Sequence, residues 1–337
     1  MAKDMKKLED LAALAGVSIA TVSRALSDSP AVNNNTKRKI WQLALANNYP
    51  FRRYTPAGPL GAEATIAIVI PRPQAREPKL SDPFILELVA SIGEAARERG
   101  CDFLVSHVSP SGHDDLLEVM ETNRADGVIF LGQSTLHEEF NELAQSQRRF
   151  VVWGAELPGQ QYCSVGSDNF IGGRRATRHL LRLGRKRIAF LGDAVAPEVM
   201  QRHQGYIEAL RENGIAIDEK LILATHFDYE SGEASIDELC GAGIKFDAIV
   251  AASDMIALGA MRALLRKGIK VPKDVSIVGY DNVQFSRFAD PSLTTISQNV
   301  EKAGKVLVSK LLGAGGSTEI PSERVPTDLI VRDSCGG

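Results

Sequence analysis

Residues 8–26, LEDLAALAGVSIATVSRAL, predict two short helices joined by a tight turn. In the first helix apolar residues recur at helical spacing, at Leu8, Leu11, Ala12 and Ala15. Gly16 supplies the backbone freedom for a sharp turn, and Ser18 is a favourable N-cap for the second helix. Because Val22, Ala25 and Leu26 form the inner stripe of that second helix, its first residues are left exposed. A helix of this kind can enter the DNA major groove and place its first residues on base edges.

The 337-residue chain carries its charge unevenly, although its formal net charge is only −3. Residues 1–59 contain nine Lys or Arg and four Asp or Glu, whereas the remaining residues contain 30 and 38. A small basic head on an acidic body indicates that only the head meets a polyanion. The length predicts two or three domains, and the 44% of hydrophobic residues are enough for substantial cores.

A third helix is expected over about residues 35–47, and the three helices together form a small head that ends near residue 49. Residues 50–63, PFRRYTPAGPLGAE, are predicted to be a linker because they hold three prolines and two glycines. The thin core of the head indicates that it is only marginally stable by itself.

From residue 64 onward short apolar runs alternate with helical segments. The expected strands are residues 66–70, 103–108, 128–131, 150–153, 188–191, 221–224, 248–251 and 276–278. Such alternation is typical of parallel sheets that are covered on both faces by helices. Because these strands are too many for one open sheet of usual size, we expect two α/β lobes.

No pattern in the sequence indicates catalysis. The chain lacks a glycine-rich phosphate loop, a nucleophile elbow and a zinc-binding helix motif, so we expect neither an enzyme nor a cofactor. The six histidines have no metal-ligand spacing. The four cysteines (Cys101, Cys163, Cys240 and Cys335) include no CxxC pair, which favours reduced thiols in a cytoplasmic protein. The first residues hold no apolar signal segment, and no run approaches the ~18 apolar residues of a membrane span.

A set of motifs resembles the lactose-repressor family of bacterial transcription regulators over nearly the whole chain. In the head these motifs are GVSIATVSRAL at residues 16–26, then Val32, Asn33, Thr36, Arg38 and Asn48-Tyr49-Pro50. In the body they are Asp168-Asn169 with Gly172, Ala176 and His179-Leu180, then Ala252-Ser253-Asp254 with Ala257 to Ala260, Gly279-Tyr280-Asp281, and Pro291 to Ile296. Each motif is weak singly, and the set is specific.

The resemblance implies a fold of two parts. An all-α helix-turn-helix head would cover residues 1–49 and a hinge residues 50–63. The ligand-binding and dimerisation body, residues 64–337, would have the two-lobed α/β architecture of periplasmic sugar-binding proteins, with two parallel doubly wound sheets. Lobe 1 would take about residues 64–162 and 296–324, and lobe 2 about 163–292 and 325–333.

The resemblance also implies that the head reads DNA. The candidate contact residues are Ser18, Ile19, Ala20, Thr21, Ser23, Arg24, Asn33, Thr36, Lys37, Arg52 and Arg53. We expect Arg24 to bind a guanine with two hydrogen bonds, and Ile19 and Ala20 to contact thymine methyl groups. The other donors would hold phosphates, which fix the register of the protein on the duplex. For each cation, the alternative is an ordinary solvated helix face.

The hinge departs from the family pattern. Relatives have a short helix here that ends in a leucine wedge for the minor groove. Pro56, Gly58 and Pro59 are poor helix residues, and Leu60 stands beyond the expected place. We therefore expect a hinge that is shorter, extended, or helical only on DNA.

An effector site in the body follows from the resemblance, residue by residue. Its candidates are Asp82, Phe84, Gln133, Trp153, Arg202, Phe227, Ser253, Asp254 and Asp281. Arg202 and Asp281 would bind effector hydroxyls, and Asp254 would either do the same or brace its own loop. The aromatic residues would pack on a sugar ring, with core packing as the alternative. Gly154 replaces an acidic residue of the galactoside-binding relative, which argues against the same sugar.

These inferences predict a sequence-specific transcription regulator, expected to be a repressor, that acts as a homodimer on a near-palindromic operator of double-stranded DNA. A mono- or disaccharide between the lobes would change operator affinity allosterically. A regulator that senses a nucleobase or nucleoside is one alternative. A solute-binding α/β protein that does not bind DNA is the other.

Overall fold

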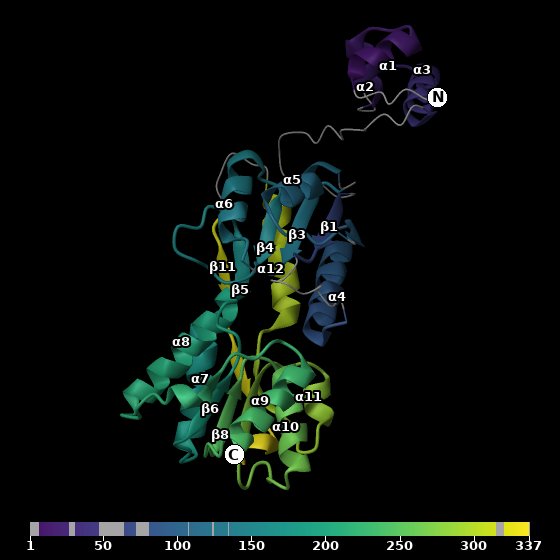
Figure 1. Ribbon diagram of the computed structural model, residues 1–337. Coiled ribbons are helices and arrows are strands. Elements are labelled where there is room, and N and C mark those ends of the chain that lie inside the picture. The colour runs from purple at the N-terminus through teal and green to yellow at the C-terminus, as the bar shows by residue number, and fades with distance from the viewer. Residues whose placement is uncertain are drawn as a thin grey trace. The chain divides into compact units, whose positions relative to one another are not determined.

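A computed structural model describes residues 7–26, 31–46, 64–71, 81–106, 108–122, 125–133, 135–314 and 320–336. The chain divides into two compact units, residues 1–57 and 58–337 (Figure 1). The predicted hinge, with Arg52 and Arg53, lies outside the described residues. The limits of the head and of the hinge therefore stay predictions.

Three helices form the described part of the first unit: α1 (Leu8–Ala15), α2 (Ile19–Leu26) and α3 (Asn34–Ala46). They enclose a small core that consists of Leu11, Ala12, Ala15, Val22, Ala25, Val32, Ile40 and Ala44. The helices predicted from the spacing of apolar residues are confirmed, including the third, which the sequence placed at about 35–47. The small number of core side chains agrees with a domain that buries little apolar surface.

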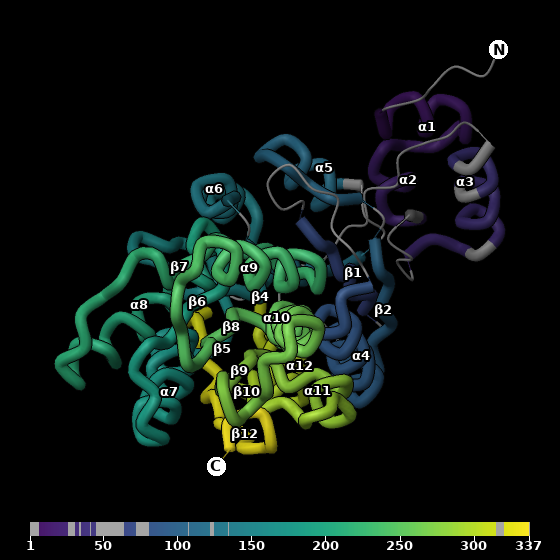
Figure 2. The backbone as a smooth tube through the Cα atoms, turned by 60° about the horizontal axis from the view of Figure 1, so that its bottom comes forward, coloured from purple at the N-terminus to yellow at the C-terminus, as the bar shows by residue number. Residues whose placement is uncertain are grey.

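The first sheet of the second unit has the strand order β11-β5-β4-β3-β1-β2, and all its pairings are parallel. Its strands are β1 (Thr65–Val69), β2 (Asp102–Val105), β3 (Gly127–Leu131), β4 (Phe150–Trp153), β5 (Ser164–Ser167) and β11 (Glu323–Val325). Helices α4 (Pro83–Glu98) and α12 (Val300–Gly313) pack side by side on one face (Figure 2). Helices α5 (His113–Thr122) and α6 (His137–Ser146) cover the other face.

The second sheet has the order β12-β10-β9-β8-β6-β7, in which only β12 runs antiparallel to its neighbour. Its strands are β6 (Ile188–Leu191), β7 (Ile222–Leu223), β8 (Ala248–Ala251), β9 (Ser276–Asp281), β10 (Thr294–Ser297) and β12 (Asp328–Ile330). Helices α7 (Asn169–Arg182), α8 (Pro197–Glu212), α9 (Tyr229–Gly241) and α10 (Asp254–Arg266) pack on it, and the short α11 (Phe285–Phe288) follows β9. Short 3-10 turns cover Glu219–Leu221 and Asp333–Cys335. The two-lobed body with two parallel-dominated sheets is confirmed.

Helices α7 and α8 approach each other closely because two glycines face the partner backbone. A Cβ atom at Gly173 would lie 2.1 Å from the carbonyl oxygen of Arg202, and one at Gly205 would lie 2.1 Å from that of Phe170. Any side chain at these two positions would push the helices apart. The glycines thus fix the positions of the backbones of Arg202 and Phe170 relative to each other.

The chain passes between the two sheets after β5, after β10, and between β11 and β12. The lobe limits predicted from the sequence, at residues 163 and 296, need correction. Strand β5 pairs within the first sheet and β10 within the second, so the crossings fall after Ser167 and after Ser297. The stretch Ser164–Ser167 has no apolar run that would have marked it as a strand.

None of the four cysteines, all of which are among the described residues, forms a disulfide bond. Within the described residues no helix has the length and apolar character of a membrane span.

Candidate functional site

The exposed face of α2 carries the predicted base-contacting residues. Val22 and Ala25 point into the core of the head and are fully buried. Ile19 has 47% of its surface exposed, and Ala20, Ser23 and Arg24 are exposed beside it. Ile19 is not among the side chains that form the core of the head. This surface therefore offers apolar and cationic groups together, as recognition of bases in the major groove requires.

Several side chains of the head cap its helices. Gly16 ends α1 in the left-handed conformation, with φ of 70°. The Ser18 hydroxyl accepts a hydrogen bond from the Thr21 amide at 3.1 Å, and the side-chain oxygen of Asn33 accepts one from the Thr36 amide at 2.8 Å. These N-caps present the first turns of α2 and α3. Contacts of Ser18, Thr21, Asn33, Thr36 and Lys37 with DNA stay predictions.

Arg202, on α8 of the second lobe, has only 4% of its surface exposed. Its Nε donates to the side-chain oxygen of Asn169 at 2.9 Å, and its Nη1 donates to the carbonyl oxygen of Ala252 at 2.5 Å. The guanidinium carbon lies 3.8 Å from the centre of the Tyr280 ring. These three contacts fix the orientation of the planar guanidinium, which suits its N–H groups to bind two oxygens of a ligand at once.

Asp281 lies at the end of β9 in an uncommon backbone conformation, with φ of 113°. A non-glycine residue with such a φ is strained, and strained residues gather at functional sites. The buried carboxylate of Asp281 accepts a hydrogen bond from Nε2 of Gln298 at 2.6 Å. The amide oxygen of Gln298 in turn accepts one from the Ser167 hydroxyl at 2.5 Å. Asp281 is thereby linked to Ser167, the residue at which the chain leaves the first sheet.

Asp254 and Ser253 support the loop before α10. One carboxylate oxygen of Asp254 accepts from the Thr295 hydroxyl at 2.6 Å, and the other accepts from the Val283 amide at 2.9 Å. Ser253 caps α10 through the Ile256 amide at 3.2 Å. These contacts support bracing, the alternative considered for Asp254. A ligand would have to displace one of them to reach its carboxylate.

The predicted residues of the first lobe lie at the start of α4, after β3 and at the end of β4. Asp82 caps α4 by accepting from the amides of Phe84 at 2.9 Å and Ile85 at 3.2 Å. The ring centres of Phe84 and Trp153 lie 6.0 Å apart. Gln133 is fully buried, and its amide group donates to the Ala155 carbonyl and the Tyr162 hydroxyl, each at 2.7 Å.

Phe227, the remaining candidate, follows β7 in the second lobe and is nearly half exposed. Among the described residues its ring pairs with no other aromatic ring, so its part in the site stays a prediction.

The two lobes touch on both sides of these residues. On one side the Gln284 amide donates to Glu87 Oε1 on α4 at 3.0 Å. On the other, Gln201 Nε2 on α8 donates to the carbonyl oxygen of Glu156 at 3.0 Å. Asp82 of the first lobe acts electrostatically on Asp281 of the second. The arginine, the carboxylates and the aromatic pair thus belong to one region between the lobes, at the carboxyl ends of both sheets, where such folds bind ligands.

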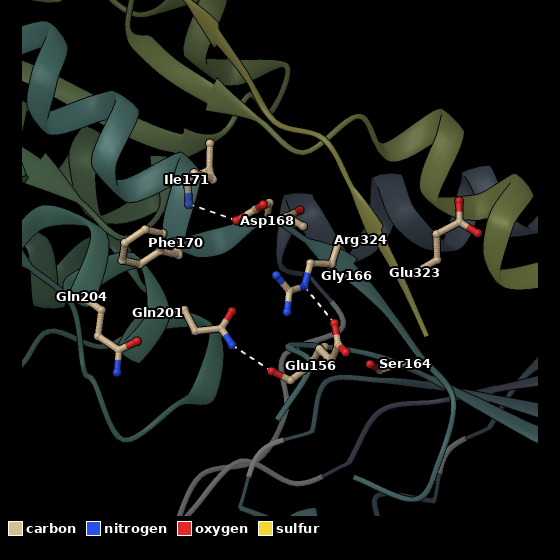
Figure 3. A pocket seen from close by; sticks show the side chains of 12 residues that line it. Glu156, Ser164, Gly166, Asp168, Phe170, Ile171, Gln201, Gln204, Glu323 and Arg324 are labelled. Carbon is tan, nitrogen blue, oxygen red and sulfur yellow. Dashed lines mark hydrogen bonds and ion pairs between the residues drawn. The ribbon is translucent and has the colours of Figure 1, made fainter. Parts of the chain in front are cut away.

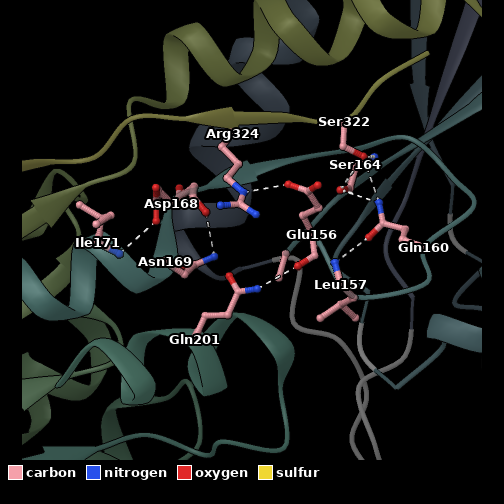
Figure 4. Close-up of polar contacts among 12 residues, drawn as sticks. Glu156, Leu157, Gln160, Ser164, Asp168, Asn169, Ile171, Gln201, Ser322 and Arg324 are labelled. Atoms are coloured by element: carbon pink, nitrogen blue, oxygen red, sulfur yellow. Dashed lines mark hydrogen bonds and ion pairs between the residues drawn. The ribbon is translucent and has the colours of Figure 1, made fainter. Parts of the chain in front are cut away.

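A cavity of about 340 Å³ lies next to this region, between β4, β5 and β11 of the first lobe and α7 and α8 of the second (Figure 3). Its lining consists of Gly154, Glu156, Ser164, Gly166, Ser167, Asp168, Phe170, Ile171, Gln201, Gln204, Glu323 and Arg324. None of the nine predicted effector residues is among them. Figure 4 shows that Glu156 joins the two walls, because its carbonyl accepts from Gln201 and its carboxylate from Arg324 Nε at 2.8 Å.

Burial dominates the electrostatics of the site. It raises the pKa of Asp281 well above the usual range, and the nearby Arg202 guanidinium only partly opposes this rise. Burial also raises the pKa of Asp254 to about 7, and it raises the pKa of Asp82 and of Glu198. Groups that donate to these carboxylates would stabilise their charged forms, and the hydroxyl groups of a sugar are such donors.

We expect the free energy of unfolding of the ligand-free protein to fall as the pH rises from about 4 to about 7. In this interval an aspartate of the unfolded chain, with a pKa of about 3.9, has lost its proton, whereas Asp254 keeps it. The folded state then binds more protons, so stability falls with rising pH. Urea unfolding at pH 5 and pH 7.5 measures this slope. The Asp254→Asn variant should show a shallower slope, and an unchanged slope would refute this origin.

The sequence analysis did not identify some residues of the site as candidates for ligand binding. Asn169 and Tyr280 hold Arg202, and both belong to motifs that had been recognised, so their positions were visible although their role was not. Gln298 and Ser167 left no signal, because their contacts join segments far apart in the chain. Glu198 lies one helical turn before Arg202 and could have been found from that spacing.

The sequence comparisons agree with this architecture. Residues 7–50 match the family model described as "Bacterial regulatory proteins, lacI family", and residues 177–335 match the "Periplasmic binding protein-like domain". The HTH-type transcriptional regulator CelR of Thermobifida fusca is 34% identical over 343 residues, which cover 97% of each chain. The chain therefore belongs to the lacI family and is a DNA-binding transcription regulator.

Two solved structures resemble the whole chain. The "transcriptional regulator CelR-cellobiose complex" is 33% identical with a TM-score of 0.70, and the match covers 98% of this chain and 100% of the other. The lac repressor dimer bound to operator and the anti-inducer ONPF is 25% identical with a TM-score of 0.69, and the match covers 99% of each chain. The resemblance expected from the motifs is thereby confirmed.

Proposed function

We propose that this protein is a repressor that binds a near-palindromic operator as a homodimer and that a carbohydrate between its lobes changes its affinity for DNA. The observation that carries this proposal is the buried group of Arg202, Asn169 and Tyr280 beside Asp281, which holds a fixed guanidinium and a carboxylate where the lobes meet. We further propose that it acts in the cytoplasm, where a bacterial chromosome lies, and that it catalyses no reaction. The relatives named above are regulators, which supports this choice.

The exposed face of α2 supports the DNA-binding part of the proposal. Arg24 is the residue whose guanidinium would pair with a guanine edge, and Ile19 and Ala20 would contact thymine methyl groups. Thr36 and Lys37 in the first turn of α3, together with Asn33 just before it, would donate hydrogen bonds to DNA phosphates. The hinge residues Arg52 and Arg53 are proposed for phosphate contacts from their sequence alone.

The chemistry between the lobes supports a carbohydrate as effector. A sugar ring offers an apolar C–H face and a rim of hydroxyl groups. Phe84 and Trp153 supply adjacent aromatic rings, Arg202 supplies donors, and Asp82 and Asp281 supply acceptors. The relative CelR was solved with cellobiose, which supports the same class of effector here. The effector would act by binding one lobe arrangement more tightly than another.

An exposed apolar face supports a homodimer. Leu86 on α4 and Phe285 and Phe288 on α11 are large and exposed, Phe288 to 78%. The hydrogen bond between Glu87 and Gln284 shows that these two helices are neighbours although they belong to different lobes. A face of this kind marks a protein interface, and we propose that a second copy of the chain covers it, as the lac repressor relative is itself a dimer. Because both lobes contribute, a change between them would alter the spacing of two heads.

Phe288→Glu is therefore expected to convert the dimer into a monomer and to weaken operator binding at least about tenfold. A charge buried in an apolar interface opposes association, and one head alone loses the contribution of its partner. Analytical ultracentrifugation with an operator titration measures both effects. The exposed Leu183→Glu, on the α7 side, is the control and should leave both unchanged. A dimeric Phe288→Glu would show that the interface lies elsewhere.

A gel-shift titration on the promoter region of the protein's own gene, repeated at rising salt, tests the proposed function. A retarded band with sequence preference that weakens with salt is expected, because phosphate contacts release counterions. The absence of a band at low salt, or a band without preference, would contradict it. Calorimetry with panels of sugars and of purine nucleosides then tests the effector class, and binding of nucleosides alone would replace the carbohydrate.

A further inference from the structure

We propose that the cavity between β4, β5 and β11 and helices α7 and α8 is a second carbohydrate subsite, so that the effector has at least two sugar rings. This inference rests on the proposed carbohydrate effector and adds its size. One ring would lie with Arg202 and Asp281, and the other would lie in the cavity (Figure 3). A volume of about 340 Å³ falls within the range of small-molecule sites.

The cavity borders the central group at three points. Gly154 of its lining directly follows Trp153, whose ring packs with Phe84. Gln201 of the lining precedes Arg202 on α8. Ser167 of the lining reaches Asp281 through Gln298, in hydrogen bonds of 2.5 and 2.6 Å. The lining of the cavity and the central group are thus connected along three segments of the chain, and the proposed ligand with two rings would span both.

Two glycines keep the first-lobe wall of the cavity bare. A Cβ atom at Gly166 would lie 1.9 Å from the carbonyl oxygen of Gly154, and one at Gly154 would lie 2.6 Å from the Gln133 side chain. Neither position admits a side chain without a backbone or core shift. The sequence analysis noted that Gly154 replaces an acidic residue of a galactoside-binding relative. In this chain Gly154 adds no side chain to the wall, and the Gln133 side chain fills the space where its Cβ atom would point.

The second-lobe wall offers the groups that a sugar ring needs. Phe170 lines the cavity and is only partly buried, which suits its ring to pack on sugar C–H groups. Gln204 also lines it, and its amide forms no hydrogen bond within the described part of the chain. Asp168 uses one carboxylate oxygen to cap α7 at the Ile171 amide, at 3.0 Å, and the other remains as an acceptor. A sugar ring could therefore pack on Phe170, and its hydroxyl groups could bond to the Gln204 amide group and to the second carboxylate oxygen of Asp168.

Two charged side chains at the rim of the cavity, Glu156 and Arg324, can give up their contact with each other and bind ligand hydroxyl groups instead. Glu156 and Arg324 form an ion pair at 2.8 Å, but their side chains are 44% and 60% exposed. Water and salt screen such a pair, so little is lost when a ligand replaces it. The Gln201 amide that crosses to the Glu156 carbonyl joins the two lobes at the same place (Figure 4). A ring bound here would therefore act on a contact between the lobes as well as on affinity.

Two substitutions at Phe170 test the subsite on the full-length protein. Phe170→Leu keeps an apolar side chain but removes the aromatic face, and Phe170→Tyr keeps that face. Isothermal titration calorimetry would compare wild type and both variants with glucose, galactose, cellobiose, lactose and maltose. Wild type should bind one disaccharide at least 10-fold more tightly than its component monosaccharide. Phe170→Leu should lose at least 10-fold of that disaccharide affinity, whereas Phe170→Tyr should stay within about 3-fold.

The readouts separate this inference from the proposed function. A monosaccharide that binds wild type as tightly as any disaccharide would overturn the subsite while leaving a carbohydrate effector in place. Disaccharide binding that Phe170→Leu leaves unchanged would also overturn it. If no sugar binds at all, the carbohydrate effector itself fails, and the subsite with it. The melting temperature of each variant, and its gel shift on the promoter fragment, would confirm that it is folded.

Discussion

Arg202→Lys is expected to abolish the response to the effector while the protein still binds its operator. Lysine keeps the positive charge beside Asp281 but replaces a planar fork with a single ammonium group. It therefore loses the contacts to Asn169 and the Ala252 carbonyl that hold Arg202 in place, together with paired bonds to a ligand. Hydrogen bonds to a charged group are worth about 1.5–3 kcal/mol each, so effector affinity should fall at least about 100-fold, since each 1.4 kcal/mol is tenfold.

Calorimetry with the effector and an operator titration in its presence measure this loss. Lysine is preferred to alanine because it keeps a cation near the buried Asp281, whereas Arg202→Ala would remove that cation together with the packing of the guanidinium on the Tyr280 ring. The exposed Arg187→Lys, directly before the first residue of β6 and in an ion pair with Asp218, serves as the control. A normal response of Arg202→Lys to the effector would show that the site is assigned wrongly.

Arg24→Ala is expected to remove most of the sequence preference of the head. A bidentate contact to guanine contributes about 1–3 kcal/mol to discrimination against the wrong base, and a dimer with two heads forms this contact twice. Operator affinity should therefore fall by about 2 kcal/mol or more, which is at least about 30-fold. Binding to unrelated DNA should change far less, because phosphate contacts supply most of it.

Fluorescence anisotropy with operator and with scrambled duplex measures both affinities. Lys37→Ala is the matched control, since a lysine on a phosphate should weaken both complexes alike and reduce their salt dependence. Equal losses for operator and scrambled DNA in Arg24→Ala would place Arg24 on the backbone instead. In that case Ile19 and Ala20 would carry the recognition of bases.

Periodicity was enough to predict those parts of the fold that bury apolar side chains. The head follows from Leu11, Val22 and their neighbours, which recur at helical spacing and lie in its core. The buried strands β3, β4 and β8 follow from continuous apolar runs. Strands β5 and β10 were not predicted, because Ser164–Ser167 and Thr294–Ser297 are rich in small polar residues. Their identity as strands depends on neighbours in the sheet, which a local pattern does not contain.

The site was predictable only where a motif marked it. Arg202 and Asp281 came from the resemblance to the family, and the structure brings both to the region where the lobes meet. The role of Asp254 could not be decided, because it depends on the Thr295 hydroxyl, which lies 41 residues further along the chain. The cavity beside the crossing strands was missed for the same reason. It is assembled from four segments of the chain, within residues 154–156, 164–171, 201–204 and 323–324, and none of them has an unusual sequence by itself.

The most direct test of the account measures operator affinity of the wild-type dimer at increasing concentrations of the sugar that calorimetry identifies. We predict that saturating sugar changes operator affinity at least fivefold, and that operator changes sugar affinity by the same factor, because coupling between two sites is reciprocal. A sugar that binds between the lobes and leaves operator affinity unchanged would contradict the central claim. The same would follow if the sugar changed the affinity of Arg202→Lys for operator as it does that of wild type.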